Sequence, residues 1–118
     1  MNINKKYLTK GSIWLVNLDP VVGREQAKKR PCLIVSTNTF NDSKYDLVCV
    51  LPITSKFRDL WWFVELQTAE SGLPIISYVI CNQVRTVSVE RLLGKPFGIV
   101  SDKSLNQVTQ RLKILLDL

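Results

Sequence analysis

The sequence contains no histidine. This absence excludes a Ser-His-Asp triad, a Cys-His nucleophile pair and an acid/base site built from two histidines. It also excludes a HExxH zinc site and an iron site with two histidine ligands. Any catalysis by this chain must therefore use arginine, lysine, acidic, tyrosine, serine or threonine side chains, or groups that belong to the substrate.

Cysteines are few, and long apolar runs are missing. Cys32, Cys49 and Cys81 lie in separate apolar segments without a CxxC spacing, so neither a disulfide framework nor a zinc module is expected. They fit small buried side chains in a reducing compartment. No stretch approaches the roughly 20 apolar residues that span a bilayer, and the N-terminus does not resemble a signal peptide. We expect a cytoplasmic protein that works without a membrane, a metal or a cofactor.

The excess of basic over acidic residues is concentrated in the first half of the chain. Residues 1–59 carry 10 basic and 5 acidic side chains, so +5 of the net charge of +6 lies there. Either this is a solvated surface, or it is the footprint of a polyanion such as nucleic acid. The 118 residues, 46% of them hydrophobic, predict one domain over residues 1–118 with its own core.

The hydrophobic pattern predicts many short strands followed by one helix. Only the tail has helical spacing, with Leu105, Val108, Leu112 and Leu115 on one stripe and Ser101 or Asp102 as its cap. The expected strands are 13–18, 32–35, 47–53, 62–66 and one or two within 75–87. Pro52 is expected to restrict its strand to a sheet edge or a bulge. The fold class is mainly β, a small antiparallel barrel with a C-terminal helix.

A long basic loop joins the first two strands. Residues 19–30 contain four cations, and Gly23 allows a reversal near the middle. Pro31 favours an extended backbone at Arg30, which would hold that guanidinium in place for phosphate recognition. Lys28 and Lys29 would supply attraction at longer range. The alternative is an ordinary mobile loop of surface cations.

Two further polar clusters end predicted strands. Thr54, Ser55 and Lys56 follow the third strand, where the threonine either caps a turn or bonds a phosphate oxygen. Residues 82–87 include Arg85, which is either a second phosphate contact or part of an interface. Trp61 and Trp62 are adjacent, so a strand would point one into the core and leave the other for base stacking or an interface.

Several of these segments, taken in order, resemble the MazF/PemK/Kid family of toxin endoribonucleases from toxin–antitoxin pairs. The matching segments are 11–16, 19–26, 30–35, 38–41, 52–55, 72–73, 82–87 and 91–92. The most specific combination is Gly-Arg-Glu-Gln at 23–26, then Arg-Pro at 30–31 before an apolar strand, then Pro-Ile-Thr-Ser at 52–55.

The resemblance implies an SH3-like barrel of the CcdB/MazF type that works as a homodimer. It implies ribosome-independent, metal-free cleavage of single-stranded mRNA at a short sequence, leaving a 2′,3′-cyclic phosphate and a 5′-hydroxyl. The expected partners are this RNA and a MazE-like antitoxin that is acidic or has an acidic tail. Arg30 and Thr54 would act at the scissile phosphate. The candidate RNA contacts are Arg24, Gln26, Lys28, Lys29, Ser55, Lys56, Asn82, Gln83 and Arg85.

The identity of the general base is open. Some family members carry an acid where this chain has Asn82, and asparagine cannot take a proton. Glu25 is the remaining candidate, either as the base or as a residue that orders the loop. Two other functions remain as alternatives. One is a gyrase poison of the CcdB type, and the other is a homologue that binds RNA without cutting it. The CcdB type uses a C-terminal tryptophan, whereas this chain ends in Leu118.

Overall fold

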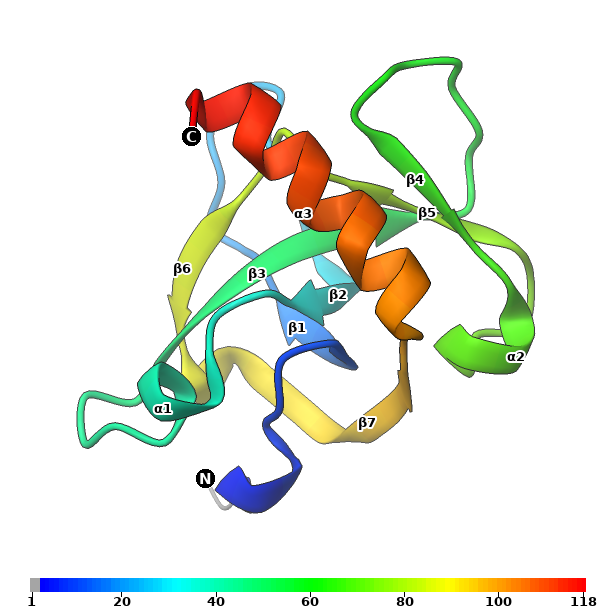
Figure 1. Cartoon of the computed structure of the whole chain (residues 1–118). Coiled ribbons are helices and arrows are strands. Elements are labelled where there is room, and N and C mark those ends of the chain that lie inside the picture. The colour runs from blue at the N-terminus through cyan, green and yellow to red at the C-terminus, as the bar shows by residue number, and fades with distance from the viewer. Residues whose placement is uncertain (1–2) are drawn as a thin grey trace.

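A computed structural model describes residues 3–118, and in it seven strands pair antiparallel to one another. Their order is β4-β5-β3-β2-β1-β7, with β6 on the same edge of β3 as β5 (Figure 1). The strands are β1 (Ser12–Asn17), β2 (Lys29–Ile34), β3 (Leu47–Thr54), β4 (Phe63–Leu66), β5 (Ser77–Ile80), β6 (Arg85–Ser88) and β7 (Leu92–Ile99). The predicted fold class, mainly β with a C-terminal helix, is confirmed.

Helices are short except at the C-terminus. The α-helices are α1 (Asn38–Asn41), α2 (Thr68–Ser71) and α3 (Asp102–Leu116), and the 3-10 turns are η1 (Lys5–Tyr7) and η2 (Val89–Arg91). Ser101 caps α3 by accepting a hydrogen bond from the Ser104 N–H at 3.2 Å. The predicted helix and one of its two predicted caps are thus present.

β3 is the central strand, so of the two positions expected for Pro52, a sheet edge or a bulge, the edge is wrong. β2 pairs with one side of β3, including Cys32 with Pro52. On the other side β6 pairs only as far as Val50, and β5 begins at Ile53. Proline is tolerated because it lies at the gap between these two partners, where no ladder bond is required of it.

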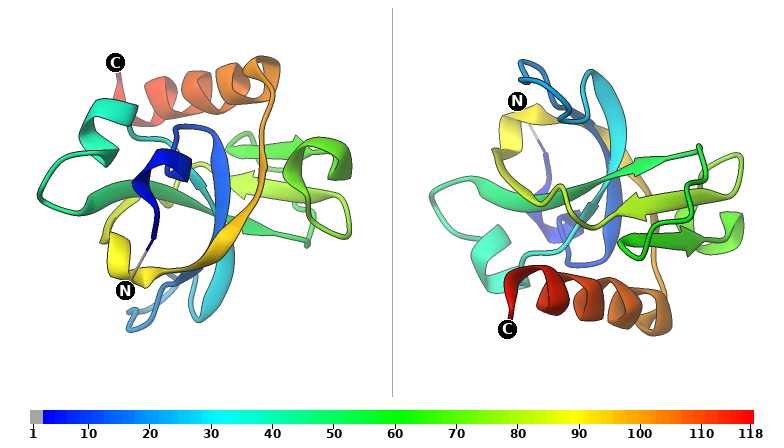
Figure 2. Two further views of the ribbon diagram at one scale, coloured as in Figure 1. Left: turned by 90° about the horizontal axis from the view of Figure 1, so that it is seen from below. Right: turned by 90° about the horizontal axis from the view of Figure 1, so that it is seen from above.

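β3 separates two apolar cores by its alternation. Val48 and Val50 point into the barrel interior with Trp14 of β1, whereas Leu51 and Ile53 point into a second core. The second core lies between the sheet and α3. The helix contributes Leu105, Val108 and Leu112 to it. In both views of Figure 2, α3 lies along one side and the β1–β2 loop projects from the opposite side. The loop therefore lies away from the helix-covered face.

A close backbone crossing joins α2 to β7. Gly72 ends α2 with φ +71°, and a Cβ on it would lie 1.9 Å from the Phe97 carbonyl oxygen. A Cβ on Gly98 would lie 2.5 Å from the Glu70 carbonyl oxygen. The crossing places the Glu70 carboxylate at the start of α3, where it accepts hydrogen bonds from the Ser101 N–H at 2.7 Å and the Ser104 hydroxyl at 2.9 Å.

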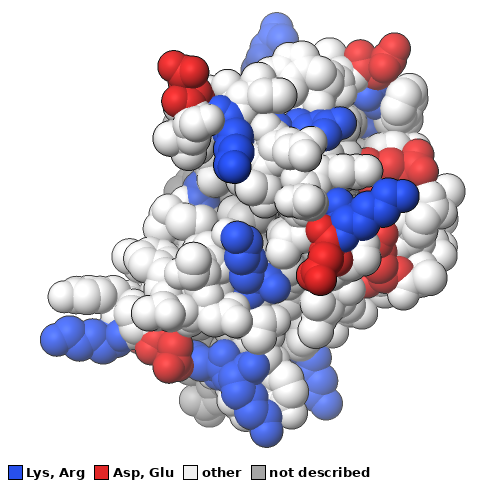
Figure 3. All heavy atoms as spheres, in the orientation of Figure 1, with Lys and Arg blue, Asp and Glu red and all other residues white. Residues whose placement is uncertain are grey.

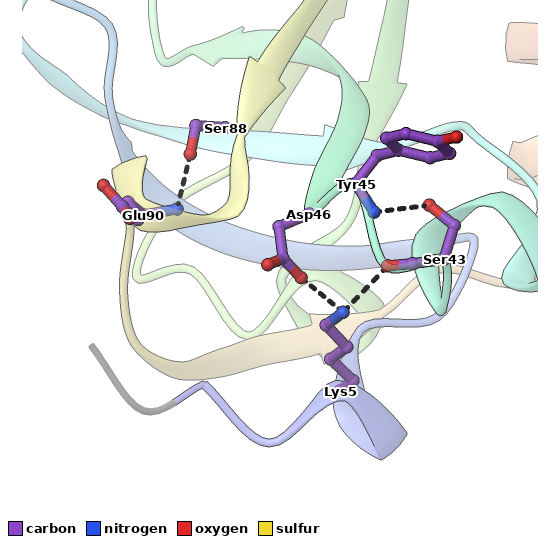
Figure 4. Close-up of polar contacts among 6 residues, drawn as sticks. All are labelled: Lys5, Ser43, Tyr45, Asp46, Ser88 and Glu90. Atoms are coloured by element: carbon purple, nitrogen blue, oxygen red, sulfur yellow. Dashed lines mark hydrogen bonds and ion pairs between the residues drawn. The ribbon is translucent and has the colours of Figure 1, made fainter.

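The N-terminal turn is tied to the loop before β3. Lys5 forms an ion pair with Asp46 and donates to the Ser43 carbonyl at 2.9 Å (Figure 4). Nearby, the Ser88 hydroxyl accepts from the Glu90 N–H at 3.2 Å and caps η2. A pair this exposed contributes little to stability, so its effect is to position η1.

The face that carries α3 is mixed in charge. Figure 3 shows basic and acidic side chains interspersed over it, without a continuous basic surface. Among residues 3–118, no helix combines the length and the apolar character needed to cross a membrane.

Candidate functional site

The β1–β2 loop is anchored at its base by backbone and side-chain contacts. The Leu18 N–H donates to the Lys28 carbonyl at 2.8 Å, and the Lys28 N–H donates to the Asp19 carboxylate at 2.9 Å. Gly23 has φ +61° at the predicted reversal. The backbone of this loop is thus held at defined points, in contrast to the alternative of a mobile surface loop.

The loop is also fastened to the turn between β5 and β6. The Gln26 N–H donates to Oε1 of Gln83 at 2.8 Å, and Nη1 of Arg85 donates to the Leu18 carbonyl at 2.6 Å. Nη1 of Arg91 donates to the Asn17 carbonyl at 3.1 Å. These contacts hold the loop and its base against the segment that contains Gln83 and Arg85.

Arg30 and Thr54 lie on neighbouring strands. β2 and β3 pair as far as Cys32 and Pro52, and Arg30 and Thr54 each lie two residues beyond that pair. Both side chains line the same two hollows of the surface. Nε of Arg30 donates to the Ala27 carbonyl at 3.1 Å. This bond leaves the Nη groups to reach outward, so the guanidinium is positioned as Pro31 predicted.

Thr54 fills the first of its two suggested roles, that of capping a turn, and its geometry is compatible with the second. Its Oγ1 accepts a hydrogen bond from the Lys56 N–H at 3.1 Å, which shapes the turn. Within residues 3–118 the hydroxyl hydrogen has no acceptor, so it is available to donate to an anion.

Arg30 and Thr54 open onto a cavity of about 520 Å³. Four cationic side chains line it and, of the residues that the structure describes, no carboxylate does. A site with this charge favours a phosphate group and strengthens hydrogen bonds to it. Its lining residues are Arg24, Gln26, Arg30, Thr54, Ser55, Lys56, Arg58, Leu60, Trp62, Phe63, Ile80, Asn82 and Gln83.

A second hollow of about 450 Å³ contains Glu25 and adjoins the cavity, with which it shares four lining residues: Arg24, Gln26, Asn82 and Gln83. The Glu25 carboxylate accepts a hydrogen bond from the Val22 N–H at 2.9 Å, across the Gly23 turn. Arg85 also lines this hollow rather than the cavity. The geometry therefore favours the loop-ordering role for Glu25 and a structural role for Arg85.

Two of the cysteine thiols are unreactive. Burial raises the pKa of Cys32 to about 12 despite the opposing effect of Arg30 and Arg85, and it raises the pKa of Cys81 to about 12 despite Arg111. Because the thiolate is the nucleophile, neither group can attack a substrate near neutral pH. Neither thiol lines the cavity, which offers positive charge and hydrogen-bond donors to a substrate.

Comparison with known proteins agrees with the motifs. The family of PemK-like, MazF-like toxins of type II toxin–antitoxin systems matches residues 9–116. This chain belongs to that toxin family. Endoribonuclease MazF9 of Mycobacterium tuberculosis is 35% identical to the toxin over 94% of this chain and 98% of its own. Endoribonuclease PemK of Escherichia coli is 36% identical over 95% of this chain and 84% of its own.

Solved structures share the fold of the toxin. MazF from Deinococcus radiodurans superposes with a TM-score of 0.81 at 23% identity, covering 93% of this chain and 96% of the other. A MazE–MazF complex from the same organism gives 0.76 at 24% identity, covering 93% and 96%. The family predicted from the motifs is thereby confirmed, and the named relatives are endoribonucleases, the expected activity class.

The structure gathers most of the predicted contact residues of the toxin in or beside the cavity. Lys28 and Lys29 instead line an adjoining hollow of about 360 Å³, which shares Arg30 and Thr54 with the cavity. The predicted RNA contacts that line the cavity itself are Arg24, Gln26, Ser55, Lys56, Asn82 and Gln83.

Some cavity residues were missed by the sequence analysis. Arg58, Leu60 and Phe63 line it, and the closeness of Arg58 to Lys56 in the chain was the available signal. Trp62 packs against the second core and also lines the cavity, whereas Trp61 is 48% exposed. Both precede β4, and their rings meet edge to face at 5.4 Å.

A pair of substitutions separates the two roles of Glu25. Glu25→Gln keeps an oxygen that accepts from the Val22 N–H, whereas Glu25→Ala removes it. We expect the glutamine variant to cleave RNA within about threefold of wild type and the alanine variant to lose about tenfold through disorder of the loop. Single-turnover cleavage rates check this. A loss of 100-fold or more in the glutamine variant would make Glu25 the general base.

Proposed function

We propose that this toxin is a sequence-specific, ribosome-independent endoribonuclease that cuts single-stranded mRNA without a metal ion. The observation that supports this most is that Arg30 and Thr54 together line a cavity with four cations. Such a site binds and polarises a phosphodiester, while RNA brings its own nucleophile, the 2′-hydroxyl. A chain without histidine can therefore carry out this reaction.

The proposed step is an in-line transfer within the RNA. The 2′-oxygen forms a bond to the adjacent phosphorus and the bond from phosphorus to the 5′-oxygen breaks, leaving a 2′,3′-cyclic phosphate and a 5′-hydroxyl. Negative charge grows on the non-bridging oxygens in the transition state. Arg30 stabilises that charge through its free Nη groups and the Thr54 hydroxyl orients one oxygen, because both are held before substrate binds.

Two protons must also move. The 2′-hydroxyl loses one and the leaving 5′-oxygen gains one. Arginine is a poor partner for either transfer because its pKa exceeds 12, and Asn82, which lines the cavity, cannot accept a proton. With no carboxylate on the described cavity wall, we assign both transfers to solvent water in the open cavity.

The same surface suits the expected protein partner. A MazE-like antitoxin with an acidic tail would be attracted to the cations that bind RNA and would compete with it. The MazE–MazF complex of Deinococcus radiodurans, which has the fold of this chain, supports an antitoxin partner. We also propose that the toxin acts as a homodimer, as the resemblance implies.

Incubation of purified toxin with single-stranded RNA in EDTA tests the proposal. We expect cleavage at a short sequence, with cyclic phosphate at one end and hydroxyl at the other, and no cleavage when the nucleotide before the cut carries 2′-deoxyribose. Sequencing of the ends gives the recognised sequence. Intact RNA, or cleavage that persists at the 2′-deoxy nucleotide, would refute the proposed reaction.

A further inference from the structure

One face of the sheet formed by β3, β5 and β4 is not covered by α3. Thr54 of β3 pairs with Tyr78 of β5. Phe63 of β4 pairs with Ile80, which lies two residues after Tyr78 on β5 and therefore on the same face. The intervening residues Val79 and Val64 point into the second core. Tyr78 and Phe63 therefore share the face of Thr54, next to the phosphate-binding cavity.

Three aromatic rings form a row on this face. The ring centroids of Phe57 and Tyr78 are 5.3 Å apart, and those of Phe63 and Tyr78 are 6.4 Å apart. Phe57 is 64% exposed, and the other two rings are half-buried. We call Phe57, Tyr78 and Phe63 the aromatic row. Packing against Tyr78 covers only part of Phe57, so the protein core does not account for the position of this ring.

Charge beside the aromatic row indicates what occupies it. Lys56 and Arg58 flank Phe57 in the chain and line the cavity together with Phe63. The acid on this face, Glu65, pairs with Tyr78 and accepts a hydrogen bond from the Gln67 side-chain amide at 2.7 Å. A strand whose phosphate is bound at Arg30 would continue over this face, with cations for its backbone and rings for its bases. Single-strand binding sites combine these two elements, because every base has a π-face that can stack.

We propose that the aromatic row is a stacking platform for an unpaired base next to the phosphate held by Arg30 and Thr54. The inference rests on the proposed function and deepens it, because it names the part of the RNA-binding surface that holds the base. Phe57 is the main contact, since it exposes the most ring surface. The row adds binding energy for single strands and excludes a duplex, whose bases remain stacked on one another.

Binding assays with RNA that cannot be cut provide the test. The probe is a labelled single-stranded RNA pool with 2′-O-methyl groups throughout, in EDTA. We expect Phe57→Ala to raise the Kd about 5- to 100-fold, the range for losing one stacked base. Tyr45→Ala is the matched control, because Tyr45 is an aromatic residue that is 71% exposed and lies in the turn before β3. Its Kd should equal that of wild type.

Two more variants separate stacking from plain apolar contact. Phe57→Tyr keeps the ring and should keep the wild-type Kd, whereas Phe57→Leu should weaken binding as much as alanine does. An unchanged Kd for Phe57→Ala, or full affinity for Phe57→Leu, overturns the inference. So does a change confined to the oligomeric mass or to antitoxin binding, which would assign the aromatic row to a protein interface.

The outcome for the proposed function is read separately, from the cleavage assay in EDTA. If wild type cuts RNA and Phe57→Ala binds the probe normally, only the stacking platform is wrong. If wild type binds the probe with the expected ranking of variants but cuts nothing, the platform stands and the proposed cleavage fails. If wild type does not bind the probe, the stacking platform is wrong, and the proposed cleavage is judged from the cleavage assay alone.

Discussion

Arg30→Ala is expected to lower the single-turnover rate of RNA cleavage by about 100- to 1,000-fold, the usual effect of removing one preorganised donor from a transition state. Nε of Arg30 is held by the Ala27 carbonyl at 3.1 Å, so its Nη groups need no reorganisation as charge develops on the phosphate. The side chain is not part of either apolar core. We therefore expect the circular dichroism spectrum and the thermal midpoint to remain close to those of wild type.

Arg111→Ala is the matched control. Nε of Arg111 also donates to a backbone carbonyl, that of Trp61 at 3.2 Å, but the side chain belongs to α3 on the other side of the sheet. Its loss removes the same charge and the same type of bond, and we expect less than a threefold change in rate.

The cleavage rate of Arg30→Lys should lie between those of wild type and Arg30→Ala, because a point charge cannot bind two phosphate oxygens in the planar geometry of a guanidinium. Undiminished cleavage by Arg30→Ala would remove this residue from the mechanism.

Most strands of the barrel could be predicted from the sequence, because their local composition is typical of strands. The runs around Trp14, Val50 and Val64 are β-branched, aromatic and bounded by turn residues, and strands lie at each of them. The stripe through Val108 likewise marks α3. In these segments local propensity and tertiary packing favour the same structure.

β7 was missed because its composition opposes its conformation. Leu92–Ile99 contains Gly94, Pro96 and Gly98, which normally interrupt a strand. Pairing with β1, with a shift of register along the way, overrides that local preference. The glycine at 98 is there because the α2 backbone crosses at this point. A contact between segments so far apart in the chain leaves no periodic signal.

The candidate site was predictable only where neighbours in the sequence are neighbours in space. Pro31 marked Arg30 as a fixed cation, and its loop was recognisable from charge. The position of Thr54 near Arg30 depends on the pairing of β2 with β3, which residue types do not specify. The aromatic row likewise joins Phe57 to Tyr78 across two segments, so neither ring was noticed when the chain was read in order.

The second large effect is expected for Gly72→Ala, which should lower the free energy of unfolding by about 3 kcal/mol or more. Two costs combine. A side chain at φ +71° costs about 1–2 kcal/mol, and the new Cβ would lie 1.9 Å from the Phe97 carbonyl oxygen, so two backbones must separate. That separation also draws Glu70 away from Ser101 and weakens the start of α3. Urea unfolding followed by circular dichroism measures the change.

Gly94→Ala separates the two costs. Gly94 has φ +73°, almost the same as Gly72, but a Cβ there would meet no described atom within 4 Å. It should therefore lose only the conformational part, about 1–2 kcal/mol. If Gly72→Ala is no more destabilising than Gly94→Ala, the crossing of α2 and β7 is not tightly packed.

Gly98→Ala would clash at the same crossing from the other side. We therefore expect the double variant that combines it with Gly72→Ala to be less destabilised than the sum of the two single effects. Once either side chain has pushed the backbones apart, the other meets less resistance.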